Sequence, residues 1–488
     1  MEKFEMVAKT LQGLEDVLAE ELRSLGAENV EPGRRMVSFE GDLETLYRAN
    51  LATRTALRIL KPIYRFQAKD TDALYEMVKE YDWDRVLSLE KTFSIDTVAF
   101  SDEFTHSRFV TYRVKDAIVD WFKDKYGPEK RPKVRLQDAD VMINVHISGD
   151  RCTISLDSSG ESLHRRGYRV AQTEAPISEV LAAGIILKSG WRGDCPLVDP
   201  MCGSGTFLIE AALIAANIMP GIYRRGFAFE HWPDFDRELF DRLYNDDSAE
   251  RTFDHKIYGA DISPKAVAIA RENIKNAGVA RYIDLEVKPL SKWETAPEEG
   301  TPGVLITNPP YGERIRVEDM EGLYASLGEK LKHVFKGYHA WVIGPKREVN
   351  ERKGVRNDYF DKIGLAPTTR TPLLNGAIET ELREYIIFDG SYKDYRAGGG
   401  KVHFGEERRE RKSDRPRRDF GPKKPFGRDA KPFNRDGKPF GRDEEEPENE
   451  FARRRNEHAL KSITGKKPSL PPAEGKFMRS RGWRKKDQ

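Results

Sequence analysis

A glycine-rich turn between an apolar strand and a helix is the feature that most limits what this chain can fold into. The apolar run 196–198 leads into the octapeptide 199–206, which begins with Asp199, contains Gly203 and Gly205, and ends with Thr206. A helical run, 207–218, follows it. A strand, a glycine-rich turn and a helix in this order bring bare backbone and a helix N-terminus close to a bound ligand.

Two common nucleotide-binding turns do not fit this segment. A dinucleotide fingerprint needs a third glycine three residues after Gly205, and position 208 is leucine. A phosphate-binding P-loop needs a Gly-Lys-Ser/Thr sequence, and none follows here. The turn therefore disfavours NAD and excludes a P-loop.

A carboxylate ends the second strand that the sequence predicts. Residues 256–261 form this strand, with Asp261 last, and Ser263 is the expected N-cap of a helix over 264–277. An acid at this place usually binds the two hydroxyls of a ribose, although a capping or solvated acid is the alternative for Asp261 alone. The intervening insertion, 217–252, is rich in aromatic and charged residues, and His231 within it is interpreted as a surface or packing histidine.

A rigid corner follows the apolar run 303–307: Asn308-Pro309-Pro310-Tyr311. The prolines fix their own φ and restrict the residues before them. The Asn308 side-chain carbonyl and the Pro309 carbonyl can then converge as acceptors on an NH2 group, and Tyr311 offers a flat face to a base. An ordinary turn at the end of a strand is the alternative.

These motifs together resemble those of class I S-adenosylmethionine-dependent methyltransferases: 199–206, 259–261 and 308–314. Two further stretches, 156–169 and 175–184, make the chain similar to the THUMP-domain RNA methyltransferases that modify guanine at its exocyclic amine in large-subunit ribosomal RNA. The resemblance covers residues 1 to about 390. Some bacterial relatives carry a second methyltransferase domain, which the residues after 390 could not form.

The resemblance implies an α/β fold with four parts. A ferredoxin-like segment over 1–50 and a THUMP RNA-binding domain over 51–160 form an α+β region. A Rossmann-like class I methyltransferase domain follows over 161–390, and a disordered basic tail occupies 391–488. The residues alone predict helices over 13–25, 71–81 and 107–126, with alternating strands over 92–100 and 141–147, which indicates small α+β layers.

The same resemblance implies S-adenosylmethionine as the cofactor. Its methionine end would pass over Gly203 and Gly205, Asp199 would orient its amino group, and Asp261 would hold its ribose. The cofactor-binding set is Asp199, Gly203, Gly205, Thr206, Asp261 and Asn308, and the catalytic set is Asn308, Pro309 and Tyr311. Acceleration would come from positioning and electrostatics without a metal, on a base flipped out of its stack.

The adenine contact is where the chain departs from the family pattern. Pro289 replaces the aspartate that often contacts the adenine, so that contact is expected from backbone or from a neighbour such as Ser291.

Basic side chains suggest where RNA binds. Those near residue 110 are flanked by Phe109 and Tyr112, which could stack on unpaired bases. Others lie in the glycine-punctuated stretch 156–169, between the two halves of the molecule. A solvated helix face is the alternative. The RNA-binding set is Arg108, Arg113, Lys115, Arg165, Arg166 and Arg169.

The C-terminal region differs from the rest in charge and pattern. Residues 401–488 hold 27 basic and 16 acidic side chains, a net charge of +11, and because the whole chain is +2, residues 1–400 carry −9. The six-residue motif Lys-Pro-Phe-Gly/Asn-Arg-Asp recurs every seven residues, at positions 424, 431 and 438. This region has too few apolar residues to offset the entropy lost on folding, which predicts disorder. Alternating Phe and Arg suit weak RNA contact, and an inert solubilising tail is the alternative.

Composition also bounds where the chain acts. Cys152, Cys195 and Cys202 are an odd number without zinc-type spacing, which suggests free thiols in a reducing cytosol. No signal peptide opens the chain, and no apolar run approaches a membrane span. We therefore expect a cytoplasmic protein whose partner is large-subunit ribosomal RNA, within a pre-ribosomal particle, and no obligate protein partner.

Two rival functions remain from the sequence. One is adenine-N6 methylation of DNA or RNA, because Asn-Pro-Pro-Tyr can serve any exocyclic amine; the RNA-binding character of 1–155 argues against DNA. The other is a non-catalytic RNA-binding or ribosome-assembly factor, against which the intact Gly203, Asp261 and Asn308 argue.

Overall fold

The computed structural model describes residues 2–173, 176–298, 300–310, 319–346, 348–350 and 355–388. Several predictions lie outside the described residues: the stacking role of Tyr311, residues 312–314 of the family motif, and residue 175. The tail after residue 388, with its repeats and its expected disorder and RNA affinity, also lies outside them.

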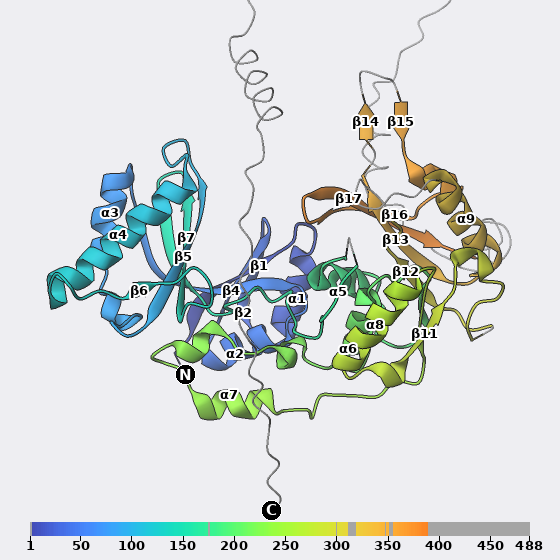
Figure 1. Ribbon diagram of the computed structural model, residues 1–488, viewed down its shortest axis with the longest axis horizontal. Helices are drawn as coiled ribbons and strands as arrows, with labels where there is room; N and C mark the ends of the chain where they lie inside the picture. Colours follow the sequence, from blue (N-terminus) through green and yellow to red (C-terminus); the bar gives the residue numbers. More distant parts are fainter. Residues whose placement is uncertain are drawn as a thin grey trace, which may run out of the picture. The chain divides into compact units, whose positions relative to one another are not determined.

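The N-terminal region forms one eight-stranded sheet in the order β2-β3-β1-β4-β8-β7-β5-β6 (Figure 1). Its strands are β1 (Phe4–Thr10), β2 (Glu28–Gly33), β3 (Met36–Gly41), β4 (Ala56–Gln67), β5 (Thr92–Phe100), β6 (Lys133–Val134), β7 (Val141–Ser148) and β8 (Arg151–Asp157). Its helices are α1 (Glu15–Ser24), α2 (Leu43–Ala52), α3 (Thr71–Glu80) and α4 (Ser107–Tyr126). The bounds of β5 and α4 are those that the sequence predicts.

Strand β4 joins the ferredoxin-like segment to the segment that follows it. Leu60 of β4 is opposite Val7 of β1 on one side and Asp157 of β8 on the other. The sheet therefore continues through the expected boundary near residue 50, because the backbone of one long strand satisfies ladders on both sides.

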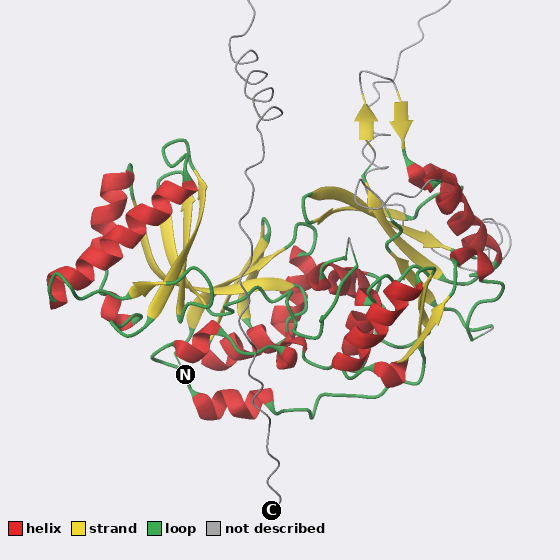
Figure 2. Cartoon of the chain, in the orientation of Figure 1, coloured by secondary structure: helices red, strands yellow, loops and turns green. Residues whose placement is uncertain are grey.

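The C-terminal half of the described chain forms a seven-stranded sheet in the order β11-β10-β9-β12-β13-β17-β16 (Figure 2). The first five are parallel, and β17 is antiparallel to β13 and β16. Their bounds are β9 (Leu197–Asp199), β10 (Ile257–Asp261), β11 (Ile283–Val287), β12 (Val304–Thr307), β13 (His339–Pro345), β16 (Thr369–Asn375) and β17 (Ile378–Ile386). A separate hairpin pairs β14 (Glu348–Asn350) with β15 (Val355–Asn357).

Helices pack against both faces of this sheet. Alternate residues of its strands join two apolar clusters: one holds residues of α5 (Glu179–Lys188), α6 (Thr206–Ala215) and α8 (Pro264–Asn276), and the other holds residues of α9 (Met320–His333). The order of the strands reverses between β9 and β12, and such a switch point opens a crevice at the carboxyl ends of parallel strands. The predicted α/β, Rossmann-like fold behind an α+β region is confirmed.

The insertion 217–252 belongs to the core of the N-terminal region. It contains the 3-10 turns η2 (Pro220–Tyr223) and η3 (Ala228–His231) and helix α7 (Arg237–Tyr244). Phe229 stacks on Tyr47 of α2 at 4.6 Å between ring centroids, and Phe240 lies edge-on to Tyr47 at 5.7 Å. The His231 side chain is 55% exposed, which agrees with a surface histidine.

The described residues contain no helix long and apolar enough to cross a membrane. The two most apolar helices, α5 and α6, have ten residues each and are covered by the sheet and by neighbouring helices.

Candidate active site

The turn between β9 and α6 uses its two glycines differently. Both have positive φ, +54° at Gly203 and +81° at Gly205, where residues other than glycine are strained. A Cβ at Gly203 would meet only Thr173 Oγ1, at 3.8 Å, whereas a Cβ at Gly205 would lie 3.1 Å from Cβ of Ala270 on α8. Gly203 lines the cavity, and Gly205 packs α6 against α8. Gly205 is not in the described cavity lining, and the passage of the cofactor over it as well as over Gly203 stays a prediction.

Asp261 lies at the carboxyl end of β10 and fastens the glycine turn. Its Oδ2 accepts a hydrogen bond from the Gly203 backbone N–H at 3.0 Å, and its Oδ1 accepts one from Ser263 N at 2.9 Å. A carboxylate has about four acceptor positions, so two remain for a ligand diol. Ser263 caps α8 as predicted, with its hydroxyl accepting from Ala266 N at 3.3 Å.

Asp199 connects the glycine turn to the neighbouring strand β12. It is 1% exposed, and its Oδ1 accepts hydrogen bonds from Met201 N at 3.2 Å and Thr307 Oγ1 at 2.9 Å. Burial raises the pKa of Asp199 to about 7, although these two hydrogen bonds oppose the shift. Asp199 thereby holds the turn beside the residue that precedes Asn308.

Asn308, Pro309 and Pro310 line the same cavity as Gly203 and Asp261. The Oδ1 atom of Asn308 is buried and accepts no hydrogen bond from the described residues. A buried acceptor without a partner costs about 1–3 kcal/mol, so this oxygen is suited to a donor that a ligand supplies.

The cavity is large enough for two reactants. Its volume is about 1850 Å³, whereas pockets for a single small ligand measure roughly 300–1,000 Å³. The glycine turn, Asp261 and the proline corner all line this cavity. Within the described residues, no group of His, Cys, Asp and Glu side chains could hold a metal ion.

Two apolar residues at the cavity were missed by the sequence reasoning. Ile262, directly after Asp261, is 72% exposed, and Leu290 also lines the cavity, whereas the described lining does not include Ser291. The sequence did offer a signal for Ile262, since a large apolar residue between the acid that ends a strand and the cap of the next helix lies outside both elements.

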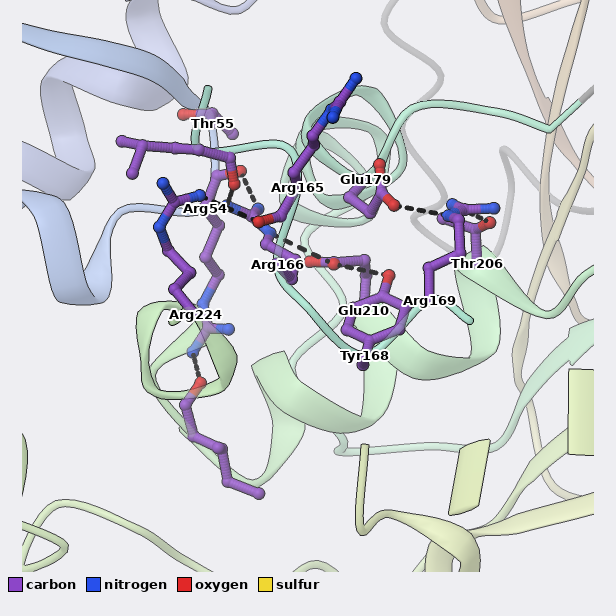
Figure 3. Close-up of polar contacts among 12 residues, drawn as sticks. Arg54, Thr55, Arg165, Arg166, Tyr168, Arg169, Glu179, Thr206, Glu210 and Arg224 are labelled. Carbon is purple, nitrogen blue, oxygen red and sulfur yellow. Dashed lines mark hydrogen bonds and ion pairs between the residues drawn. The ribbon is translucent and has the colours of Figure 1, made fainter. Parts of the chain in front are cut away.

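Arg166 is in the interior, contrary to its predicted RNA contact. Its side chain is 2% exposed, and it donates hydrogen bonds to the backbone carbonyls of Arg54 and Leu163 (Figure 3). Its Nε lies 3.4 Å from Oε1 of the fully buried Glu210. A phosphate cannot reach this guanidinium, because the protein itself occupies its donors.

Arg169 is 15% exposed and bonds to both helices beside the glycine turn (Figure 3). Its guanidinium donates to Glu179 of α5 at 2.6 Å, to Ser204 Oγ at 3.1 Å and to Thr206 Oγ1 at 2.9 Å. Asn273 of α8, which was not singled out from the sequence, acts alongside it: its side chain bonds to Val170 N and to the Ser204 carbonyl. Arg169 thus supports the turn that carries Gly203.

The predicted RNA-binding residues of α4 differ in exposure. Arg113 pairs with Asp72 at 2.5 Å and lies over the Tyr75 ring, and Lys115 pairs with Asp116 at 2.5 Å. Arg108 is exposed, as are Phe109 (55%) and Tyr112 (50%). Arg165 is also exposed (66%) and pairs with Glu161.

Three family models match successive parts of the chain. An RlmL ferredoxin-like domain matches residues 5–60, a THUMP domain matches 68–157, and an RMKL-like methyltransferase domain matches 166–357. Together they cover nearly all of the eight-stranded sheet and the strands β9 to β13 of the seven-stranded sheet, whereas β16 and β17 lie beyond the last match.

Whole proteins and a solved structure are similar over the same region. A candidate RNA methyltransferase, slr0064 of Synechocystis sp., is 38% identical over 384 residues, which are 78% of this chain and 96% of that protein. Ribosomal RNA large subunit methyltransferase K/L of Syntrophotalea carbinolica is 41% identical over 387 residues, 77% of this chain and 52% of that protein. The chain therefore spans about half the length of the K/L relatives.

The crystal structure of SMU.472, a candidate methyltransferase complexed with S-adenosylhomocysteine, superposes with a TM-score of 0.69 at 32% identity, covering 80% of this chain and 100% of that one. The three matching domains, the relatives and the shared fold lead to one assignment. The chain belongs to the THUMP-domain RNA methyltransferase family whose members combine an RlmL ferredoxin-like domain with an RMKL-like methyltransferase domain.

Proposed function

We propose that this chain transfers a methyl group from S-adenosylmethionine to the exocyclic N2 amine of a guanine in large-subunit ribosomal RNA. The observation that carries the proposal is the Oδ1 of Asn308 on a rigid proline corner, which is buried and has no partner among the residues that the structure describes. It opens into the same cavity as Gly203 and Asp261. The large-subunit substrate is taken from the names of the K/L relatives.

The cofactor site is made by residues whose remaining bonding capacity matches S-adenosylmethionine. Asp261 would accept from the ribose hydroxyls, Asp199 would face the amino group, and Ile262 and Leu290 would cover the adenine. Gly203 leaves space that a Cβ would narrow, and Thr206 lines the same cavity at the start of α6. The cofactor supplies an electrophilic methyl group on a sulfonium.

The chain's own contribution to the chemistry is positioning. A guanine N2 amine is a weak nucleophile because its lone pair is delocalised into the ring. Asn308 Oδ1 and the Pro309 carbonyl would accept its two N–H groups and hold the nitrogen lone pair toward the methyl donor. Acceptors already fixed by prolines need no reorganisation during the reaction, which is the main source of acceleration in such sites. Tyr311 completes the proposal as a stacking platform, and the spare proton leaves to water.

The proposed cofactor site is expected to be pH-dependent through Asp199. Its pKa is about 7 in the free protein, so at pH 6 most molecules carry a neutral Asp199. A cationic amino group favours the carboxylate, so binding requires loss of that proton. Affinity should rise about tenfold from pH 6 to pH 8. Calorimetric titration of S-adenosylhomocysteine at both pH values measures this, and Asp199→Asn should remove the dependence. Equal slopes in the two proteins would show that Asp199 is not the coupled group.

The proposed substrate is tested by mapping methylated nucleosides. Large-subunit ribosomal RNA from cells with and without the protein is digested and compared by mass spectrometry. We expect loss of one N2-methylguanosine, restored when the purified chain methylates the deficient RNA. Loss of N6-methyladenosine instead would establish the adenine alternative, and an unchanged nucleoside profile would favour a non-catalytic RNA-binding role.

A further inference from the structure

The insertion 217–252 forms one side of the cavity, and Arg224 ties this side to the loop after β8. Arg224 donates four hydrogen bonds to the backbone of the loop after β8: Nη1 to the carbonyls of Ser162 (3.1 Å) and Arg165 (2.9 Å), and Nη2 to those of Ser159 (3.1 Å) and Glu161 (2.6 Å). Its guanidinium also lies 5.2 Å from the Phe227 ring centroid. The insertion and the loop are therefore held together as one wall.

Arg225 directly follows Arg224, whose side chain bonds to the Arg165 carbonyl. Both Arg165 and Arg225 line the cavity and are exposed. Figure 3 shows the Arg165 side chain extending away from the buried network around Arg166. Its ion pair with Glu161 is exposed and therefore weak.

Arg225 has no ion pair or hydrogen bond among the described residues, in contrast to Arg166, Arg169 and Arg224 along the same cavity. The guanidinium groups of those three arginines donate hydrogen bonds to the protein itself. Arg165 and Arg225, which follow or adjoin this network, therefore have donors left for an external anion.

We propose that Arg165 and Arg225 form a phosphate-binding rim that holds the RNA backbone next to the flipped nucleotide. This inference rests on the proposed function. A base that leaves its stack to reach Asn308 brings its own phosphates to the mouth of the cavity. Guanidinium groups match phosphate oxygens with paired donors.

The ligand is a chain rather than one small anion, because the cavity continues beyond the rim. It reaches Met142 of β7, in the eight-stranded sheet, and Asp138 in the loop before that strand, both far from Asp261 and Asn308 in sequence. An RNA strand could follow this path from the RNA-binding region to the proline corner. The insertion then serves substrate binding as well as the core.

The test compares two arginines of the same insertion. Arg225→Gln removes the proposed contact, and Arg242→Gln is the matched control, because Arg242 is exposed on α7 and is not in the described cavity lining. Binding of the full chain to a fluorescein-labelled, single-stranded RNA of about 20 nucleotides, a length that could span an extended groove, is followed by anisotropy across KCl concentrations.

Each phosphate contact on a single strand contributes a slope of about 0.7 to log affinity against log salt, which is roughly fivefold in affinity at 0.1 M salt. Arg225→Gln and Arg165→Gln should each lower the slope by about 0.7 and the affinity about fivefold, and the double variant should lower the slope by about twice as much. Arg242→Gln should keep the wild-type slope, and all variants should keep wild-type affinity for S-adenosylhomocysteine.

Equal losses in Arg225→Gln and Arg242→Gln would overturn the rim, since the effect would then be one of net charge. An unchanged slope in Arg225→Gln, with normal RNA binding by the wild-type chain, would also overturn it and leave the proposed function intact. Failure of the wild-type chain to bind RNA would overturn both.

Discussion

Asn308→Ala should lower the rate of methyl transfer by at least about 10²-fold and leave cofactor affinity within about twofold of wild type, because removal of one preorganised hydrogen-bonding group from a reacting centre costs this much. The Asn308 Oδ1 atom is buried and accepts no hydrogen bond from the part of the chain that the structure describes, so its loss removes an acceptor for the substrate amine and breaks no bond there. Single-turnover transfer of labelled methyl groups, at saturating cofactor, to ribosomal RNA from cells that lack the protein measures the rate.

Asp261→Ala is the complementary variant, and it should do the opposite. It removes the carboxylate that holds Gly203 N and faces the proposed ribose site, so we expect S-adenosylhomocysteine to bind at least about tenfold more weakly, the effect of one or two charge-assisted hydrogen bonds. Calorimetry measures this affinity. Normal turnover by Asn308→Ala would remove the proline corner from the reaction, and unchanged affinity in Asp261→Ala would remove Asp261 from the cofactor site.

Arg166→Met should destabilise the folded protein by about 3 kcal/mol, since breaking a buried ion pair leaves the other charge uncompensated. Glu210 is fully buried; burial raises its pKa, and Arg166 is the main group that opposes this shift. The variant also leaves the carbonyls of Arg54 and Leu163 without this donor. This value is at the lower end of the range for breaking a buried ion pair, about 3–5 kcal/mol, because Arg54 still lies close to Glu210. Denaturant unfolding followed by tryptophan fluorescence gives the change.

A second substitution separates the ion pair from general packing. In Arg166→Met/Glu210→Leu the buried carboxylate is gone as well, and much of the stability should return, because apolar residues of similar volume often replace a buried pair without loss. If Arg166→Met unfolded at the wild-type denaturant concentration and only weakened RNA binding, then Arg166 would contact RNA as the sequence suggested.

The sequence determined the local elements and the order of the chemical groups along the chain. The glycine turn, the Ser263 cap and strand 92–100 depend on residues within a few positions of one another, where φ preferences, capping and alternation act directly. The proline corner likewise follows from two fixed φ angles. The order of these groups also predicts that Gly203, Asp261 and Asn308 meet, because the carboxyl ends of adjacent parallel strands share one edge of a sheet.

Only the tertiary structure decided which like residues are buried and what each one contacts. Arg165, Arg166 and Arg169 are within five positions, yet one is exposed, one bonds to Glu210 44 residues away, and one supports Ser204 and Thr206. The aromatic residues of 217–252 similarly pack on Tyr47, about 180 residues earlier in the chain. Burial and ion pairing depend on segments brought together by the whole fold, so a basic residue's neighbours in sequence do not determine whether it faces solvent, a carboxylate or RNA.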